Sequence, residues 1–437
     1  MSKKCLIILL LCSQIKALTL TQAIENSLQS NTDLMEIKQQ QQLDQLEIIN
    51  QRQQLYPSIN LKGLAQWNKH HTNTEDASID LNWTTAHGTN LVAHLQDGHN
   101  DSLTLTQPLL KGWNSQLNRA PITKAINKAR LTHIKSIELQ NHVIKHTFEL
   151  YLTTLLKHQE LDLKKRALNE AKTNYLTGEK RYHKGSLAKL EYLELQHYFL
   201  QAKLNFQQGE QSLANAKNNL SLYTHTPIKK TIISKHLKVI LPDKLPKNTP
   251  PHSKLIHQNL SIRQLNIQLK QASLNLQQAK ENKNWDLNFI YKRENSNDQS
   301  AGLSLDIPLS TTAKDLAIKS QKLLISQLEH QRANLTNHLK QDLDNAQNNL
   351  QQSFTSMNLA ELEVQTTKIK HQASKIKFKN GDLPYSKLTE AYDKWLTSLL
   401  NQRSLQIEYM LAILVYYEKT NQLHQHWKFI ANTSNRP

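Results

Sequence analysis

The sequence is poor in the residues that build a thick globular core. Of its 437 residues, 38% are hydrophobic and 6% are aromatic, and there are only 9 glycines. A chain this polar suits long helices, each with a narrow apolar stripe and most of its surface in water. Disorder is the alternative for such a composition, but leucines recur at helical spacing over most of the length, which argues against it.

Cysteine is almost absent. The 2 cysteines, Cys5 and Cys12, both lie within residues 1–17. There, two lysines precede a short apolar run and Ala17 offers a small residue, the layout of a secretory signal peptide. We expect cleavage to leave a chain without cysteine, which excludes disulfides, zinc–thiolate sites and cysteine nucleophiles. Lipidation of Cys12 is disfavoured by the large Leu11 before it.

Acidic residues are outnumbered, and the formal net charge is +18. Such a balance is found in nucleic-acid-binding proteins. The lysines and arginines, however, are dispersed among Glu, Gln and Asn along helical segments, which favours solvated helix faces. We therefore expect no nucleic-acid partner, and an anionic membrane surface is the alternative.

Catalytic motifs are also missing. We find no phosphate-binding glycine loop, no HExxH and no nucleophile elbow, so the sequence predicts a protein that is not an enzyme and needs no cofactor. A polar insert at residues 68–101 contains five histidines without the fixed spacing of a metal site; they are His70, His71, His87, His94 and His99. The insert is predicted to be an external loop without metal, although the alternation in LNWTTAHGTNLVAHL would also suit a further hairpin.

An internal repeat organises the chain. Helix, short strands, very long helix, glycine turn and long helix occur in this order twice. The predicted domains are listed here: signal peptide 1–17, first repeat 18–223, proline-rich linker 224–252, second repeat 253–423 and C-terminal tail 424–437. Within each repeat, the opening helix is predicted at residues 20–55 and 253–282.

The two longest helical patterns hold for about 65 residues, or about 100 Å at about 1.5 Å per residue. A single globular domain does not need helices of that length, whereas a bundle or tube does. In the second one, large residues repeat every seven positions and small residues accompany them, as in a coiled-coil seam. The two columns are Leu343, Leu350, Met357 and Val364, and Leu339, Ala346, Ser353 and Ala360.

Four short segments alternate between apolar and polar residues, two in each repeat; they are residues 58–67, 102–109, 285–291 and 302–309. Strands of this length can cross the hydrocarbon layer of a bilayer. Tyr56, Trp113 and Trp285 lie at the helix–strand junctions, where an interfacial aromatic belt is expected. A soluble sheet is the alternative, but the chain offers no broad apolar surface to cover it.

Strands that face lipid must form a closed sheet, because an open edge leaves backbone groups unsatisfied in hydrocarbon. Four strands are too few to close a barrel. Several chains must therefore contribute to one barrel: two chains would supply eight strands and three would supply twelve.

At this level of detail the chain resembles the TolC-like outer-membrane efflux factors over most of its length. The resemblance is carried by LTLTQAIENSLQSN at the start, LYPSINL at a helix–strand junction and TQPLLKG before the first long helix. KGSLAKLEYLELQ and NGDLPYSKLTEAYDKWL, at the two long-helix turns, complete it. Their order, spacing and duplication are more specific than any one of them.

The resemblance implies a fold that is mainly α with a small β part. Four transmembrane strands per chain would form a 12-stranded barrel in a homotrimer, set on an α-helical barrel. The protein would lie in the outer membrane, in contact with its lipid, with a periplasmic helical domain. It would export drugs or proteins in a tripartite efflux or type I secretion system. Its partners would be a periplasmic adaptor and an inner-membrane transporter of the RND or ABC type.

The same resemblance implies roles for the two turns. Both would form the periplasmic tip that docks the adaptor, through Gly185, Ser186, Gly381, Asp382 and Leu383. The two acidic positions that line the family's aperture fall on Lys387 and Glu390, so one acid is kept and one is replaced by a base. Glu191 falls on a position that is often acidic, and we hypothesise an ion pair between Glu191 and Lys387 of adjacent hairpins.

Two rival interpretations stay open at this stage. A periplasmic adaptor would have one helical hairpin flanked by β-rich domains, whereas this chain has two hairpins and paired strands. A coiled-coil structural protein would use the positive charge and would not be retained in a membrane. The sequence does not identify the cargo or the cognate pump.

Overall fold

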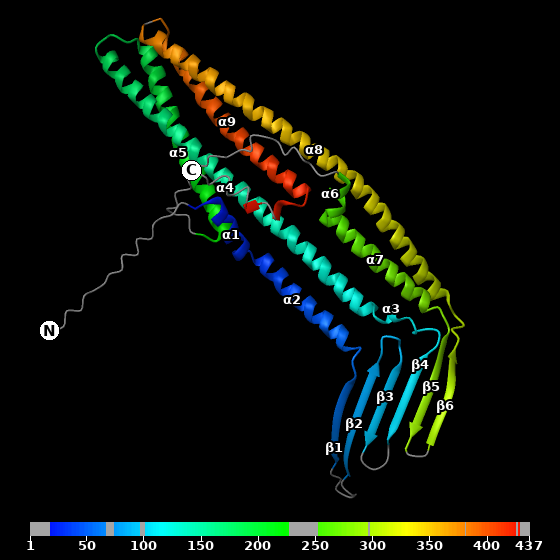
Figure 1. Ribbon diagram of the computed structural model, residues 1–437. Helices are drawn as coiled ribbons and strands as arrows, with labels where there is room; N and C mark the ends of the chain where they lie inside the picture. Colours follow the sequence, from blue (N-terminus) through cyan, green and yellow to red (C-terminus); the bar gives the residue numbers. More distant parts are fainter. Residues whose placement is uncertain are drawn as a thin grey trace, which may run out of the picture. The chain divides into compact units, whose positions relative to one another are not determined.

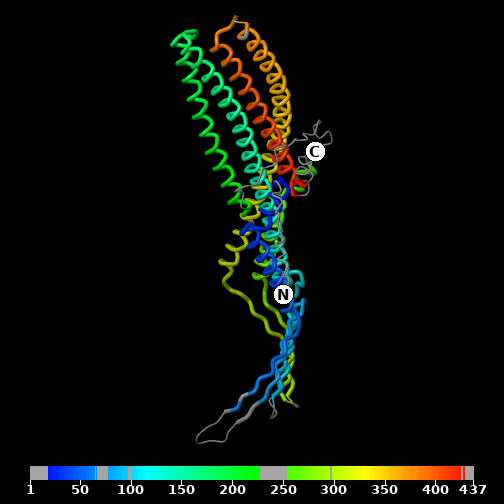
Figure 2. Tube along the Cα trace, turned by 90° about the vertical axis from the view of Figure 1, so that its left-hand side faces the viewer, coloured from blue at the N-terminus to red at the C-terminus, as the bar shows by residue number. Residues whose placement is uncertain are grey.

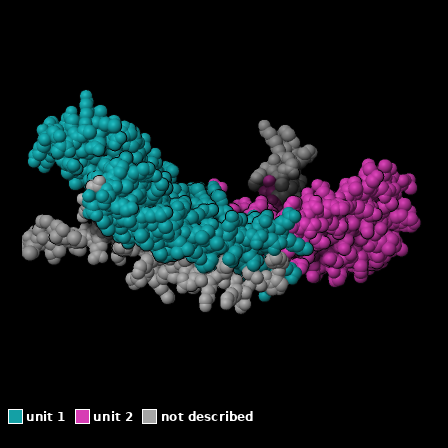
Figure 3. All heavy atoms as spheres, turned by 90° about the horizontal axis from the view of Figure 1, so that it is seen from above, with its two compact units in different colours: residues 1–34, 138–255, 340–437 teal, residues 35–137, 256–339 magenta. Residues whose placement is uncertain are grey.

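The structure is a computed structural model that describes residues 18–66, 74–96, 101–226, 252–295, 298–380, 382–424 and 427–428. The predicted signal peptide, most of the linker and Gly381 lie outside these residues. The described chain divides into two compact units (Figure 3), which are the described parts of residues 1–34, 138–255 and 340–437, and of residues 35–137 and 256–339. Both predicted repeats contribute to both units.

The chain is mainly helical with one antiparallel sheet, which confirms the predicted class (Figure 1). Its helices are α1 Leu20–Ser30, α2 Thr32–Gln53, α3 Ser115–Asn118, α4 Ala120–His183, α5 Lys189–Thr224, α6 His252–Gln258, α7 Leu260–Glu281, α8 Thr312–Lys379 and α9 Tyr385–Lys419. Its strands are β1 Ser58–Gln66, β2 Thr74–Thr84, β3 Asn90–Gln96, β4 Ser102–Pro108, β5 Asp286–Glu294 and β6 Asp298–Asp306. The long helices α4 and α8 have 64 and 68 residues, close to the predicted length.

Each predicted opening helix is interrupted by an asparagine. Asn31 lies between α1 and α2, where its Oδ1 accepts the backbone N–H of Leu34 at 2.9 Å. Asn259 caps α7 in the same way by accepting the N–H of Ser261 at 3.0 Å. Asparagine satisfies free N–H groups at a helix start, so it favours a new helix over continuation of the old one. The predicted continuous helices at residues 20–55 and 253–282 are therefore wrong at these two points.

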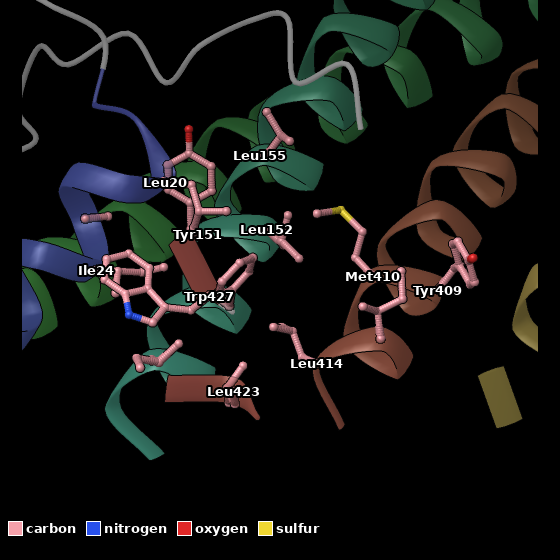
Figure 4. Packing of buried hydrophobic residues seen from close by; sticks show 14 of the residues in the cluster. Leu20, Ile24, Tyr151, Leu152, Leu155, Tyr409, Met410, Leu414, Leu423 and Trp427 are labelled. Atoms are coloured by element: carbon pink, nitrogen blue, oxygen red, sulfur yellow. The ribbon is translucent and has the colours of Figure 1, made fainter. Parts of the chain in front are cut away.

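The first unit is built around two helical hairpins, α4–α5 and α8–α9, whose turns lie at the same end in both Figure 1 and Figure 2. Its main core lies among α1, α4, α8 and α9 and includes Tyr151, Leu152 and Leu414 (Figure 4). The Tyr151 hydroxyl donates to the carbonyl of Leu18 at 3.0 Å, which fastens the start of the described chain to α4.

The predicted heptad seam of α8 is buried over most of its length. Leu343, Leu350 and Met357 are at most 9% exposed, and Ala346 and Ala360 are at most 5% exposed. Alanine at these points removes side-chain bulk and so lets α9 lie close to α8. The seam therefore confirms the coiled-coil prediction from the heptad spacing.

The second unit contains the sheet, α2, α3, α7 and the adjoining parts of α4 and α8. A buried carboxylate connects two of its helices. Asp44 of α2 accepts a bond from Gln40 Nε2 at 2.9 Å and pairs with Lys128 Nζ of α4 at 3.3 Å. Burying a carboxylate is costly unless it is paired, so this contact fixes the register between α2 and α4. None of the described helices has the length and apolar character needed to cross a membrane.

The sheet has 6 strands in the order β1-β2-β3-β4-β5-β6, all antiparallel. The prediction of four strands per chain is therefore wrong in number. The four predicted strands correspond to β1, β4, β5 and β6, and the additional pair β2–β3 occupies the insert predicted as an external loop. The alternative interpretation of the insert, a further hairpin, is the one that the structure shows.

We expect the core of the first unit to tolerate truncation poorly. Leu152 is completely buried, so Leu152→Ala should lower the free energy of unfolding by about 2–5 kcal/mol through lost burial and a residual cavity. Leu190 is 69% exposed, and Leu190→Ala should change the free energy of unfolding by about 0.5 kcal/mol or less. Urea unfolding in detergent, followed by far-UV circular dichroism, compares the two. Equal shifts for both variants would contradict the location of the core.

Candidate functional site

One face of the sheet is mostly apolar, although Arg293, opposite Leu103, and Gln107, opposite Phe289, also lie on it. Opposite residues in an antiparallel ladder project from the same face. One row runs Trp83, Leu91, Leu105 and Tyr291, and the next runs Ile59, Leu81, Ala93 and Leu103. Many of these side chains are open: Leu61 is 78% exposed and Leu303 is 69% exposed. A broad exposed apolar surface marks a site of contact with lipid or protein.

The other face carries polar and charged groups. Lys62, Asp80 and His94 lie side by side on it, with Lys62 Nζ 2.6 Å from Asp80 Oδ2 and the His94 ring bonded to the other Asp80 oxygen. Figure 1 shows no described helix of this unit lying over either face of the sheet. A soluble sheet normally covers its apolar face with a core. This one instead separates an apolar side from a polar side, as the wall of a membrane barrel does.

The predicted interfacial aromatics border the helix-facing end of the strands. Tyr56 precedes β1, Trp113 follows β4 and Trp285 precedes β5, and all three are at least 52% exposed. The structure adds Trp83 at the end of β2, whose indole N–H donates to the carbonyl of Leu55 at 3.1 Å. Its alternation with Ile79 and Leu81 could have revealed Trp83 in the sequence.

The first hairpin turn is closed by a glycine. Gly185 has φ +74°, a left-handed conformation that costs other residues energy. Its N–H donates to the carbonyl of Tyr182 and the N–H of Ser186 to that of Arg181, both at 2.9 Å. This pair of bonds is a Schellman cap, which satisfies the last carbonyls of α4. Gly185 and Ser186 are exposed, and Glu191 lies exposed in the first turn of α5.

The second turn joins α8 to α9. The N–H of Asp382 donates to the carbonyl of Lys377 at 2.9 Å, the counterpart of the Ser186 bond. Asp382 is exposed and Leu383 is half-buried. Pro384, in extended conformation, precedes the first residue of α9 and accepts the N–H of Lys387 at 3.1 Å.

Beyond this turn, Glu390 is held between two lysines of its own helix. Its Oε2 lies 2.9 Å from Lys387 Nζ and its Oε1 lies 2.8 Å from Lys394 Nζ. The hydrogen bonds from Lys394 and Lys387 lower the pKa of Glu390 to about 2. Within the single chain, therefore, the charge partner of Lys387 is Glu390. The hypothesised pair with Glu191 of an adjacent hairpin stays a prediction.

Glu390 lies in a groove between α8 and α9 that is strongly basic. The groove has a volume of ≈ 430 Å³ and is lined by Lys370, Lys377, Lys387 and Lys394 with Glu390 as its one acid. One carboxylate thus offsets part of the charge of four ammonium groups. Loss of that carboxylate would leave like charges facing one another across the groove.

The two hairpins are joined by hydrogen bonds that the sequence did not reveal. Tyr198 of α5 donates its hydroxyl to Asp393 Oδ1 of α9 at 2.8 Å. Asn174 of α4 donates to the Tyr385 hydroxyl, also at 2.8 Å. Burial raises the pKa of Asp393 and, to about 12, the pKa of Tyr385. We call these four residues the hairpin seam. They are far apart in sequence, so no local pattern predicts their contact.

The described residues contain no group of His, Cys, Asp or Glu arranged to hold a metal. Of the five histidines of the insert, His70, His71 and His99 lie outside the described residues. His94 is bonded to Asp80, and the His87 ring lies 6.1 Å from that of Trp113.

Comparison with known proteins agrees with this geometry. Residues 23–224 match the model of the family described as outer membrane efflux protein. No curated protein is significantly similar in sequence. Among solved structures, the CmeC outer membrane channel of Campylobacter jejuni has 13% identity and a TM-score of 0.68, covering 97% of this chain and 90% of its own.

Two further structures are similar to a comparable degree. The outer membrane protein VceC of Vibrio cholerae has 13% identity and a TM-score of 0.66, covering 92% of this chain and 95% of its own. The outer membrane channel MtrE of Neisseria gonorrhoeae, in its open state, has 15% identity and a TM-score of 0.66, covering 92% and 88%.

Residues 23–224 thus resemble the outer membrane efflux protein family, and the whole chain has the fold of TolC-like channels. The resemblance inferred from the sequence motifs is confirmed. These relatives are channel proteins and not enzymes, and the comparisons give no support to the adaptor alternative.

The ion pairs of Glu390 with Lys387 and Lys394 should make the stability of the protein depend on pH. A carboxyl whose folded pKa is depressed stabilises the fold above its unfolded pKa, and this effect is lost as the pH falls through the folded value. Wild type should therefore melt at a higher temperature than Glu390→Gln at neutral pH. The difference should shrink as the pH falls from 4.5 towards about 2. Thermal melts across this range check it, and a difference that is independent of pH would show that the ion pairs do not act through charge.

Proposed function

We propose that this protein is the outer-membrane channel of an export system that moves drugs or proteins out of the cell. The observation that carries the proposal is the uncovered sheet, apolar on one face and charged on the other, in a chain with the fold of outer-membrane channels. Its apolar face would meet the lipid of the outer membrane and its polar face would line the pore. The helical unit would extend into the periplasm.

The sheet of one chain has two open edges, β1 and β6. Unpaired backbone N–H and C=O groups are not tolerated in hydrocarbon, so copies of the chain must pair β1 of one with β6 of the next. A homotrimer, as implied by the family resemblance, is the assembly that we propose. Its partners would be a periplasmic adaptor and an inner-membrane transporter of the RND or ABC type, for tripartite efflux or type I secretion.

The hairpin turns are the proposed periplasmic end of the channel. We assign the aperture to Glu390, Lys387 and Glu191. The ion pairs of Glu390 set how much positive charge in the groove remains uncompensated. Adaptor docking is assigned to the exposed turns themselves. The residues concerned are Gly185, Ser186, Gly381, Asp382 and Leu383.

Planar-bilayer conductance of membrane-extracted, detergent-purified protein tests this function. We expect a small conductance for the wild type, because the hairpin seam joins the two hairpins and Glu390 offsets part of the lysine charge in the groove. Glu390→Ala leaves Lys387 and Lys394 without their acid, so repulsion between the lysines should open the tip and raise the conductance. Lys387→Ala removes one positive charge and leaves the Lys394–Glu390 pair, so its effect should be smaller.

The result that contradicts the function is equally clear. A protein that stays soluble without detergent and forms no channel would exclude an outer-membrane channel. Channels whose conductance is the same in wild type and in both variants would leave the function in place but remove the aperture from Glu390.

The hairpin seam provides a second test of the tip. Tyr198→Phe removes the hydroxyl that bonds to the carboxylate of Asp393, which should loosen α5 from α9 and raise the conductance. Tyr175→Phe is the matched control, because the Tyr175 hydroxyl bonds only within the first hairpin, to Glu179 at 3.0 Å and to Tyr192 at 3.3 Å. Equal conductance changes in both variants would show that the seam has no special role.

A further inference from the structure

We infer that the β2–β3 hairpin is a third membrane-spanning hairpin, so that each subunit contributes six strands to the channel wall and the apolar face of this hairpin contacts lipid hydrocarbon. The inference rests on the proposed channel function. It concerns the insert at residues 68–101, where the sequence favoured an external loop. It also changes the size of the wall that the chain builds.

The register of the sheet is the main argument. β2 and β3 lie between β1 and β4 and are bonded to both, so they cannot leave the wall without breaking two ladders. Ile79 is opposite Leu61 on one side and Leu95 on the other, and Trp83 is opposite Leu91. The apolar face therefore continues through the hairpin in phase. A shift by one residue would have placed charged groups there instead.

The exposure of this face indicates its partner. Ile79 is 42% exposed, Leu95 is 50% exposed and Leu61, next to Ile79 on β1, is 78% exposed. On the opposite side of the hairpin, Asp80 pairs with Lys62 and His94. Hydrocarbon is the environment that matches a continuous apolar face next to strands of the same kind. Asp80 connects β1, β2 and β3 on the side away from lipid.

The turn of the hairpin is anchored at the helix-facing end of the sheet, so the hairpin spans the same height as its neighbours. Asn118 Nδ2 donates to the carbonyl of Ala86 in the turn at 3.1 Å and to that of Gly112 at 2.6 Å. Gly88 has φ +77° and packs so closely that a Cβ would lie 2.2 Å from the Gly112 carbonyl oxygen. The Thr89 hydroxyl donates to Gln107 Oε1 at 2.6 Å. An outer loop would not need this fit.

The consequence is a wider pore at the membrane. Three subunits with six strands supply eighteen strands, where four strands each would supply twelve. Barrel diameter grows roughly linearly with strand number, so the wall would be about one and a half times as wide as a twelve-stranded one. The exit for cargo would be wider in the same proportion.

Cysteine labelling of the full-length chain tests lipid contact. After residue 17 the chain has no cysteine, so single cysteines can be introduced without background once Cys5 and Cys12 are replaced by serine. Ile79→Cys and Asn82→Cys sample the two faces of β2, and Leu61→Cys and Asn60→Cys sample the two faces of β1 as matched controls. Each carries a bimane fluorophore, and the protein is reconstituted in vesicles of brominated phosphatidylcholine, whose bromines quench fluorophores in the hydrocarbon layer.

We expect bimane at Ile79 to lose the same fraction of its fluorescence as bimane at Leu61, with little loss at Asn82 and Asn60. Quenching at Leu61 but not at Ile79 overturns the inference and leaves the channel function in place. Absence of quenching at both overturns the membrane sheet itself, and with it the proposed function. The two failures are thus distinguishable.

A cryo-electron microscopy map of the detergent-extracted protein provides the second measurement. Six wall strands per subunit are expected, with the Ala86–Gly88 turn against the Gly112 segment. Four wall strands per subunit, with β2 and β3 outside the wall or folded into the lumen, would show that the inference is wrong even if every labelled variant folds poorly.

Discussion

The structure depends on a sheet that no helix covers. Backbone hydrogen bonds pair all neighbouring strands, and only the outer sides of β1 and β6 are left open. Its apolar face, with Leu61 and Leu303 largely exposed, needs a non-aqueous environment. Its polar face, with Lys62 paired to Asp80, needs water. The proposed membrane-spanning wall, closed by further copies, would satisfy both faces and both edges at once.

The long helices reflect the small number of apolar residues in the chain. The described core of the first unit is a cluster of buried side chains where α1, α4, α8 and α9 meet, and Tyr151 ties the incoming chain to it. The α8 seam of Leu343, Leu350 and Met357, two of which belong to this cluster, is a single narrow stripe. A helix with one such stripe can pair with a neighbour but cannot surround a core. Helices of 64 and 68 residues are consistent with a tube.

How much of this structure the sequence could predict depended on how far apart along the chain the interacting residues lie. Heptads and strict alternation are local, so the α8 seam and four strands were correctly placed. β2 was missed because its first residues, Thr74 to Asp76, are polar and hide the alternation of Ile79, Leu81 and Trp83. Asn31 and Asn259 break helices by side-chain caps that hydrophobic spacing does not register. The Tyr198–Asp393 bond joins residues 195 positions apart, beyond any local pattern.

The sheet and the tip are held by different kinds of bond, and this difference suits their proposed tasks. Backbone ladders cannot exchange partners without exposing unsatisfied groups, so six paired strands make a permanent wall. The hairpins are joined instead by side chains such as Tyr198, Asp393 and Asn174, whose polar atoms water can satisfy when they separate. The pairs of Glu390 with Lys387 and Lys394 are exposed, so breaking them costs little. A channel that must stay sealed in the membrane and open at its tip needs this distribution of bonds.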